Sequence, residues 1–179
     1  MKRTKQLYLV IIIACLIIIA WSTYYTLGGF EPVEIYVMEV KERTVIGKEY
    51  IEKYHYADFS DRIEAAKIEV DSGRLKGMLT VIFFQNDTIG IDSAHYFIGA
   101  SQDEIKDVLR VPAGYSYKEF RANKVFKIFM TQHELVRPRP EKVAELVQVK
   151  AIEEGAVLQP FSFELYYPDR SFSVEYWAR

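Results

Sequence analysis

The chain has 179 residues, half of them hydrophobic, with 23 Lys and Arg against 25 Asp and Glu. This length suits one domain with a short appendage, and the composition is too apolar for a disordered protein. A single cysteine excludes a disulfide framework and a cysteine-based zinc site. Aromatic residues make up 15% of the chain, which favours a β-rich domain with an aromatic-lined cavity.

The beginning of the chain predicts a membrane anchor. Residues 1–6 carry three basic side chains, and residues 7–27 carry no charge. About 20 such residues are enough to cross a bilayer as a helix. The next charge is Glu31, so the positive-inside rule places the N-terminus in the cytoplasm and residues 31–179 on the other side of a membrane.

Two kinds of processed leader compete with this single-pass anchor. A cleaved signal peptide ends at small residues, and Trp-Ser-Thr-Tyr-Tyr at residues 21–25 offers no good site. A lipoprotein signal is suggested by Ile-Ile-Ala-Cys at residues 12–15, which resembles a lipobox. Mature lipoproteins continue with polar residues, whereas Cys15 is followed by four apolar ones. We expect an uncleaved anchor, with secretion or processing at Cys15 as the alternatives.

The charge of the remaining chain argues against nucleic acid as a partner. Residues 28–179 hold 20 basic and 25 acidic residues, a formal charge of −5. A nucleic-acid-binding domain needs the opposite sign and a basic stripe. The three histidines are isolated, and the chain has no phosphate-binding loop or nucleophile motif. We therefore expect neither a metal nor a cofactor.

The first half of this part predicts strands around one helix. Apolar and polar residues alternate over 33–40 and 44–56, which is typical of two half-buried strands joined in a hairpin. Apolar residues at helical spacing then predict a helix capped by Asp58 and ended by Gly73. Strand signals return in two further segments, at residues 79–84 and 95–98.

The second half repeats this order. A helix begins at Pro140 and ends at Gly155. Strands are predicted before and after it, at residues 108–111, 115–120, 125–130, 161–167 and 172–177. The pattern predicts an α+β fold of duplicated strand–helix–strand modules, at about 31–100 and 107–179, with antiparallel sheets and two main helices.

Two short motifs in this order resemble a known family. They are Val-Pro-Ala-Gly-Tyr at residues 111–115 and Phe-Glu-Leu-Tyr at residues 163–166. Together they resemble the GyrI-like small-molecule-binding domain of the bacterial effector-binding superfamily, across roughly residues 31–179. The resemblance implies two modules with a ligand cleft between them, for bulky and often cationic or aromatic compounds. It also implies that some relatives are effector domains of transcription activators and others hydrolyse cyclopropanoid natural products.

The candidate ligand-binding residues centre on Glu164, which the resemblance places at the late-strand glutamate of the family. Strand alternation independently puts Glu164 on one face with Tyr166. A desolvated carboxylate beside aromatic rings attracts a cation or acts as an acid or base with a raised pKa. The alternative is a solvated Glu164 paired with a lysine. The other candidate wall residues, for which ordinary strand packing is the alternative, are Tyr54, Tyr56, Tyr96, Tyr115, Tyr117 and Trp177.

Three functions remain open at this point. The first is a membrane-anchored, non-enzymatic domain that binds small aromatic or cationic molecules in the cleft. The second is a hydrolase of strained-ring compounds, in which Glu164 activates water and a tyrosine donates a hydrogen bond. The third is a domain that docks a protein partner. A buried Glu164 in an aromatic cavity favours the first two, whereas a filled centre with an exposed apolar patch favours the third.

Overall fold

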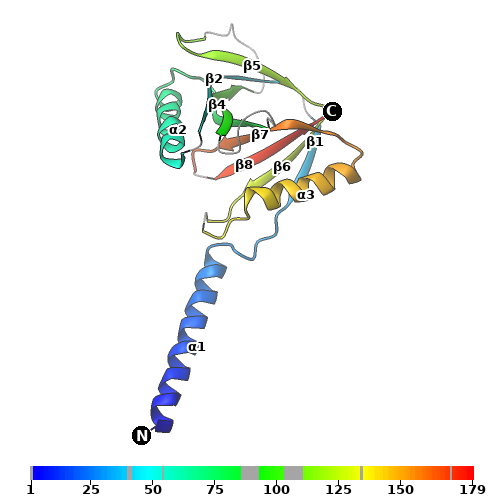
Figure 1. Cartoon of the computed structure of the whole chain (residues 1–179). Coiled ribbons are helices and arrows are strands. Elements are labelled where there is room, and N and C mark those ends of the chain that lie inside the picture. Colours follow the sequence, from blue (N-terminus) through cyan, green and yellow to red (C-terminus); the bar gives the residue numbers. More distant parts are fainter. Residues whose placement is uncertain are drawn as a thin grey trace.

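The computed structural model describes residues 2–39, 42–53, 55–85, 93–102, 111–133, 135–169 and 171–179, and of residues 2–7 the backbone only. A long helix, α1 (Lys2–Thr26), extends away from a domain in which two helices cover a sheet (Figure 1). The domain elements are β1 (Ile35–Glu39), β2 (Glu42–Lys53), α2 (Tyr56–Asp71), β3 (Met78–Phe84), β4 (Ser93–Gln102), β5 (Ser116–Arg121), β6 (Lys124–Met130), α3 (Pro140–Glu153), β7 (Leu158–Tyr166) and β8 (Phe172–Ala178).

The described strands form one eight-stranded sheet in the order β1-β6-β8-β7-β3-β4-β2-β5, and every pairing is antiparallel. The predicted α+β class with antiparallel strands is therefore confirmed. The four strands β1, β6, β8 and β7 form one half of the sheet, and β3, β4, β2 and β5 form the other. Strands β7 and β3 pair where the two halves meet.

The predicted hairpin between the first two strands is wrong. Strand β1 pairs with β6, whereas β2 pairs with β4 and β5 at the far side of the sheet. Burial explains the separation, because Ile35 of β1 packs against the core under α3 while Val45 and Ile46 of β2 are buried in other clusters. Residues 103–110 lie outside the described residues, and the division into modules at 31–100 and 107–179 stays a prediction.

Both domain helices cover the same face of the sheet. Helix α2 buries Phe59 and Ala66 against β3 and β4, and α3 buries Val143, Val147 and Ala151 against β6 and β8. These residues belong to the apolar stripes predicted from helical spacing. The helices thus leave the β7–β3 boundary between them as the place where the two halves of the domain meet.

The predicted ends of these helices are mostly confirmed. Helix α3 begins at Pro140, and Gly73 and Gly155 follow the two helices with φ of +74° and +64°, a conformation that glycine adopts without strain. Helix α2 begins three residues earlier than predicted. Its N-cap is His55, which makes no side-chain capping bond, and Asp58 lies in the first turn, where its charge suits the helix dipole.

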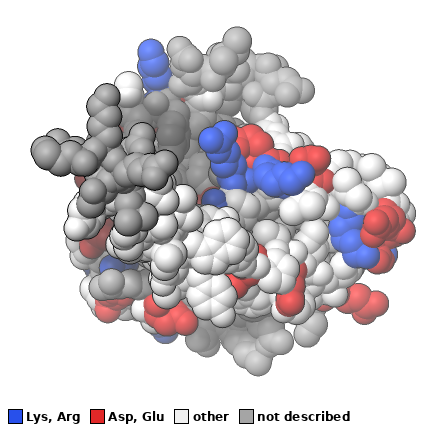
Figure 2. All heavy atoms as spheres, turned by 90° about the horizontal axis from the view of Figure 1, so that it is seen from below, with Lys and Arg blue, Asp and Glu red and all other residues white. Residues whose placement is uncertain are grey.

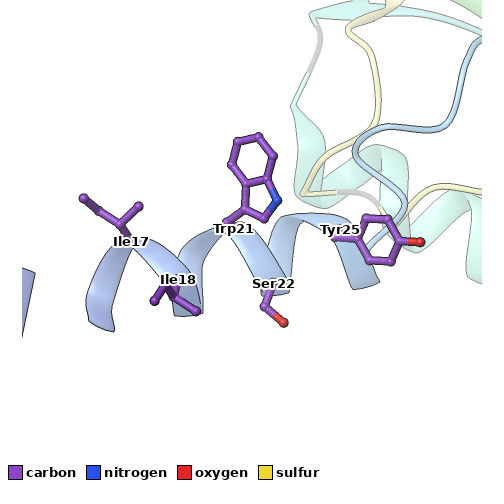
Figure 3. A pocket seen from close by; sticks show the side chains of 5 residues that line it. All are labelled: Ile17, Ile18, Trp21, Ser22 and Tyr25. Carbon is purple, nitrogen blue, oxygen red and sulfur yellow. The ribbon is translucent and has the colours of Figure 1, made fainter. Parts of the chain in front are cut away.

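Helix α1 is long and apolar enough to cross a membrane. Its apolar stretch, Tyr8–Thr26, has 19 residues with a mean hydropathy of 2.2 and is not buried against the domain. At 1.5 Å per residue it is about 28 Å long, close to the ~30 Å of a bilayer core. Figure 3 shows side chains of α1 projecting outward, with only the Tyr25 end approaching the domain. A signal sequence near the N-terminus has the same properties.

Candidate ligand site at Glu164

Glu164 lies in the middle of β7, at the boundary between the two halves of the sheet. It pairs with Val81 of β3 on one side and with Val174 of β8 on the other. Val81 belongs to the core cluster under α2, and Val174 to the cluster under α3. Strand alternation buries Phe163 and Leu165 on the opposite face, and leaves Glu164 partly exposed on the face that carries the helices.

Aromatic side chains lie on the same face of the sheet as the Glu164 carboxylate. The hydroxyl of Tyr166 donates a hydrogen bond of 2.6 Å to Oε2 of Glu164. The Tyr166 ring in turn stacks on Phe172 of β8, with ring centroids 5.8 Å apart and an angle of 19° between the planes. Tyr176, two residues beyond the partner Val174, is buried on the same face. The carboxylate thus accepts a hydrogen bond from a neutral tyrosine, with further aromatic side chains on the same face.

The protein around Glu164 disfavours its negative charge. Burial raises the pKa of the Glu164 carboxyl above its usual value, although the hydrogen bond from Tyr166 and the charge of Arg137 act in the opposite direction. Burial also raises the pKa of Tyr176 to about 12, and the negative charge of Glu164 contributes to that shift. A cation that bound beside Glu164 would replace part of the hydration that the carboxylate has lost.

The charged side chain of Arg137 already packs on one aromatic ring of this site. The guanidinium carbon of Arg137 lies 4.0 Å from the centroid of the Phe172 ring, a cation–π contact. Arg137 also donates from Nη2 to the backbone oxygen of Gln132, at 3.2 Å. Both residues belong to the segment between β6 and α3. The site therefore combines a poorly hydrated carboxylate with rings that accept a positive charge.

Tyr96 shares this face of the sheet but is committed to other contacts. Its hydroxyl donates to Glu52, which also accepts two hydrogen bonds of 2.8 Å from Arg62 of α2. Its ring is buried against Phe59 and stacks on Tyr50. Burial, followed by the bond to Glu52, raises the pKa of Tyr96 to about 12. Tyr96 on β4 therefore contacts α2 directly at Phe59 and through the Glu52–Arg62 ion pair.

The other tyrosines predicted for the site lie elsewhere or outside the described residues. Tyr56 begins α2 and is 73% exposed, and Tyr117 on β5 is 53% exposed. The ring of Tyr115 lies 4.6 Å from the ammonium group of Lys48. Tyr54 is outside the described residues. Among the predicted tyrosines, Tyr166 is the one that a described contact places beside Glu164.

Trp177 lies on the opposite face of the sheet from Glu164. Because Glu164 pairs with Val174, the odd-numbered residues of β8 face away from Glu164. Trp177 is fully buried there and packs on Phe163 with ring centroids 4.8 Å apart. Trp177 is therefore a core residue and does not line the candidate site.

The site includes three residues that the sequence did not predict, namely Arg137, Phe172 and Tyr176. The alternation of β8 puts Phe172, Val174 and Tyr176 on one face, but only the pairing register shows which face also holds Glu164. Arg137 comes from a segment without regular structure. Periodicity carries no information about such a segment, so no signal in the sequence placed its guanidinium near β7.

A surface pocket lies between β2 and α2, and Glu164 is not among its lining residues. It has a volume of about 360 Å³ and a mixed lining of Lys48, Tyr50, Asp58, Asp61, Arg62 and Ala65. The two basic and two acidic side chains of this lining balance, so it has no net formal charge that would select a ligand. Among the described residues, no three His, Cys, Asp or Glu side chains are grouped as metal ligands would be.

Charges of both signs are mixed on the face from which α1 leaves the domain. Figure 2 shows this face from below, and Lys and Arg side chains lie there beside Asp and Glu, with uncharged surface between them. Ion pairs such as Lys142 with Glu145 and Lys150 with Glu153 have this pattern on α3. No broad patch of one sign is visible on the described part of this surface.

Comparison with solved structures finds the same fold in bacterial proteins. EcmrR in its complex with DNA is similar with a TM-score of 0.58 and 11% identity, over 99% of this chain and 70% of that one. SAV2435 bound to tetraphenylphosphonium is similar with a TM-score of 0.55 and 14% identity, over 81% of this chain and 92% of that one. A hydrolase from Listeria innocua is similar with a TM-score of 0.52 and 10% identity, over 82% of this chain and 92% of that one.

These likenesses show the fold. At such low identities they carry no activity or ligand over to this chain. The architecture is consistent with the GyrI-like fold that the two sequence motifs resemble. No protein-family model matches the chain, and comparison with curated proteins finds no relative.

Proposed function

We propose that this protein binds a small, lipophilic organic cation at Glu164 and is held to a membrane by α1. The observation that carries the proposal is the partly buried Glu164 carboxylate, whose pKa is raised by burial and which accepts a hydrogen bond from Tyr166, itself stacked on Phe172. A ligand with a delocalised positive charge loses little hydration on entering such a site, and it gains both the carboxylate and the ring faces.

Two further observations support a cation as the ligand. Arg137 rests on Phe172 at 4.0 Å, so a planar positive group is already accommodated beside the carboxylate. SAV2435, which shares the fold, is a protein solved with tetraphenylphosphonium, a cation surrounded by aromatic rings. A ligand of this type would compete with Arg137 for Phe172, and the segment carrying Arg137 would then have to move aside.

The membrane anchor is the second part of the proposal. The apolar stretch Tyr8–Thr26 has the length of a single span, and three basic residues precede it. The first charges after it are acidic, at Glu31 and Glu34. The positive-inside rule then leaves the N-terminus in the cytoplasm and the domain on the other side of the membrane.

Calorimetric titration of the full chain with tetraphenylphosphonium tests the site. We expect binding, and we expect Glu164→Gln to weaken it by about 1–3 kcal/mol, or roughly 5- to 150-fold in Kd, because a charge-assisted contact is lost. Glu119→Gln is the matched control. Glu119 is an exposed carboxylate on β5, and its loss changes the net charge equally.

The stability of the Glu164→Gln chain provides a second readout. A raised pKa means that ionisation of Glu164 costs stability as the pH rises above the usual glutamate range, so the neutral amide should leave the free energy of unfolding at pH 7 equal or higher. A chain in which Glu164→Gln lowers stability and leaves tetraphenylphosphonium binding unchanged would contradict the proposal. Glu164 would then be a structural residue.

Hydrolysis is a second candidate function, favoured by the same raised pKa and by the adjacent Tyr166 hydroxyl. Glu164 would accept a proton from water, and the Tyr166 hydroxyl would donate its hydrogen bond to the substrate in place of Glu164. Incubation with a cyclopropanoid compound distinguishes this function, since a hydrolase converts the compound to a product heavier by one water and a binding protein returns it unchanged. Docking of a protein partner stays a prediction.

A further inference from the structure

The end of α1 is fastened directly to the domain. One residue beyond the helix, the backbone oxygen of Leu27 accepts a hydrogen bond of 3.0 Å from the N–H of His133. Glu31 accepts another, of 2.8 Å, from the hydroxyl of Thr131. The segment that follows β6 therefore lies at the level of the helix end. If α1 spans a bilayer, this level is the membrane surface.

Aromatic packing makes this junction compact. The chain reverses at Gly28, where φ is +80°, so that Phe30 packs on Trp21 and Tyr24 with ring centroids 5.0 and 4.9 Å apart. A Cβ atom at Gly29 would lie 2.4 Å from the Tyr24 ring, so the close approach depends on glycine. Trp and Tyr prefer the headgroup level of a membrane, which places the junction there.

The same segment also contributes to the Glu164 site. Gln132 is adjacent to His133, and its backbone oxygen holds the guanidinium of Arg137, which lies on Phe172. Phe172 begins β8, and Figure 1 shows this end of β8 on the side of the domain from which α1 leaves. Short contacts thus join the end of α1 to the aromatic rings beside Glu164.

The segment also presents an apolar side chain outward. Leu135 is 78% exposed, two residues from His133 and two from Arg137. An apolar side chain next to a membrane span can enter the headgroup region, where such groups are buried by roughly 5–10 Å.

We propose that the ligand reaches Glu164 from the membrane surface, as a lipophilic cation already dissolved in the lipid headgroup region. This inference rests on the proposed function and adds the source of its ligand. A cation with a large apolar part is concentrated in the bilayer, and the short junction holds the segment that carries Arg137 next to that layer. The effective concentration at the site then follows the membrane content of the cation more than its aqueous concentration.

A spacer at the junction tests this source of the ligand. About ten Gly and Ser residues inserted between Gly29 and Phe30 would separate the domain from the helix end by roughly 17 Å. Native and spacer chains are placed in neutral phosphatidylcholine vesicles and titrated with two probes. Methyltriphenylphosphonium and decyltriphenylphosphonium share one cationic head, but the decyl chain drives the second into lipid.

We expect the spacer to weaken binding of the decyl probe by about tenfold or more and to leave binding of the methyl probe nearly unchanged. Equal decyl binding by both chains would overturn the inference and leave the proposed function intact, because the ligand would then arrive from water. If neither probe binds to the native chain or to the spacer chain, the proposed function is overturned as well.

A second variant decides the case if the spacer weakens both probes equally. Leu135→Asp keeps the junction intact and alters an exposed side chain, so the fold should be preserved. It would place a charge against the lipid, where an apolar side chain is preferred. Loss of decyl binding alone supports entry from the membrane, and unchanged decyl binding overturns it.

Discussion

Replacing Glu175 with Gln should lower the free energy of unfolding by about 3–5 kcal/mol, the cost of leaving buried charges without a partner. Glu175 is buried on the face of the sheet opposite the helices. Its two carboxylate oxygens bind Arg43 at 2.6 Å and Lys127 at 3.1 Å. It also accepts a hydrogen bond of 3.2 Å from the indole nitrogen of Trp177.

Arg43 and Lys127 both form an ion pair with this carboxylate. Burial alone would lower the pKa of Lys127, but the hydrogen bond with Tyr167 and the charge of Glu175 raise it overall. The variant keeps the shape of Glu175 and removes its charge, so Arg43 and Lys127 would remain buried beside a neutral amide. Because burial holds their charges in a poorly hydrated place, they cannot recover the loss from solvent.

Urea unfolding of the full chain in detergent, followed by far-ultraviolet circular dichroism, measures this effect. Urea is preferred because guanidinium is a salt that screens ion pairs. The exposed Glu119→Gln change should stay within about 0.5 kcal/mol of the native chain. A loss below about 1 kcal/mol for Glu175→Gln would show that Arg43 and Lys127 do not rely on Glu175.

Replacing Trp177 with Ala should cost a similar amount, about 3–5 kcal/mol, by leaving a cavity in the core. Trp177 is fully buried among aromatic rings, with Phe163 at 4.8 Å and Phe120 and Phe161 at 6.4 Å between ring centroids. The guanidinium of Arg43 lies 5.5 Å from the indole ring. Urea unfolding measures the loss.

The milder change Trp177→Phe separates a core residue from a ligand residue. The smaller ring keeps most of the packing, so the chain should fold with a smaller loss of stability than Trp177→Ala causes. Its affinity for tetraphenylphosphonium should equal that of the native chain, because Trp177 and Glu164 lie on opposite faces of the sheet. A folded Trp177→Phe chain that binds about tenfold more weakly would return Trp177 to the ligand site.

Local patterns in the sequence predict most of the elements but not the order of the strands. Helical spacing identifies α2 and α3 because each buries one stripe of side chains on the sheet, and Pro140, Gly73 and Gly155 mark their ends. The separation of β1 from β2 could not be predicted in this way. Alternation shows that a strand has a buried face, but it does not show with which other strands that strand pairs.

The candidate site shows the same division between local and distant information. Glu164 and Tyr166 are two residues apart on one strand, so alternation is enough to put them on one face. The place of Trp177 depends on the register between β7 and β8, and a shift of one residue exchanges it with Tyr176. Arg137 reaches the site from an irregular segment, where no periodicity applies.

The topology also explains why Glu164 is the residue on which a ligand site would centre. It lies on β7 next to β3, where the half of the sheet under α2 meets the half under α3. A polar group at such a boundary is less completely covered than one under either helix. Glu164 is accordingly partly exposed, and burial raises the pKa of its carboxyl.

The most direct test of the account is the pKa of Glu164 with and without a cation. Carbon-13 NMR of the glutamate side-chain carboxyls, with the Glu164→Gln chain identifying the signal, follows this group through a pH titration. We expect a pKa above 4.5 in the free chain, because burial disfavours the charge. We expect a lower pKa in saturating tetraphenylphosphonium, because a bound cation favours the carboxylate. Binding should correspondingly weaken as the pH falls through the pKa of the free chain. A Glu164 pKa that tetraphenylphosphonium leaves unchanged would contradict the account.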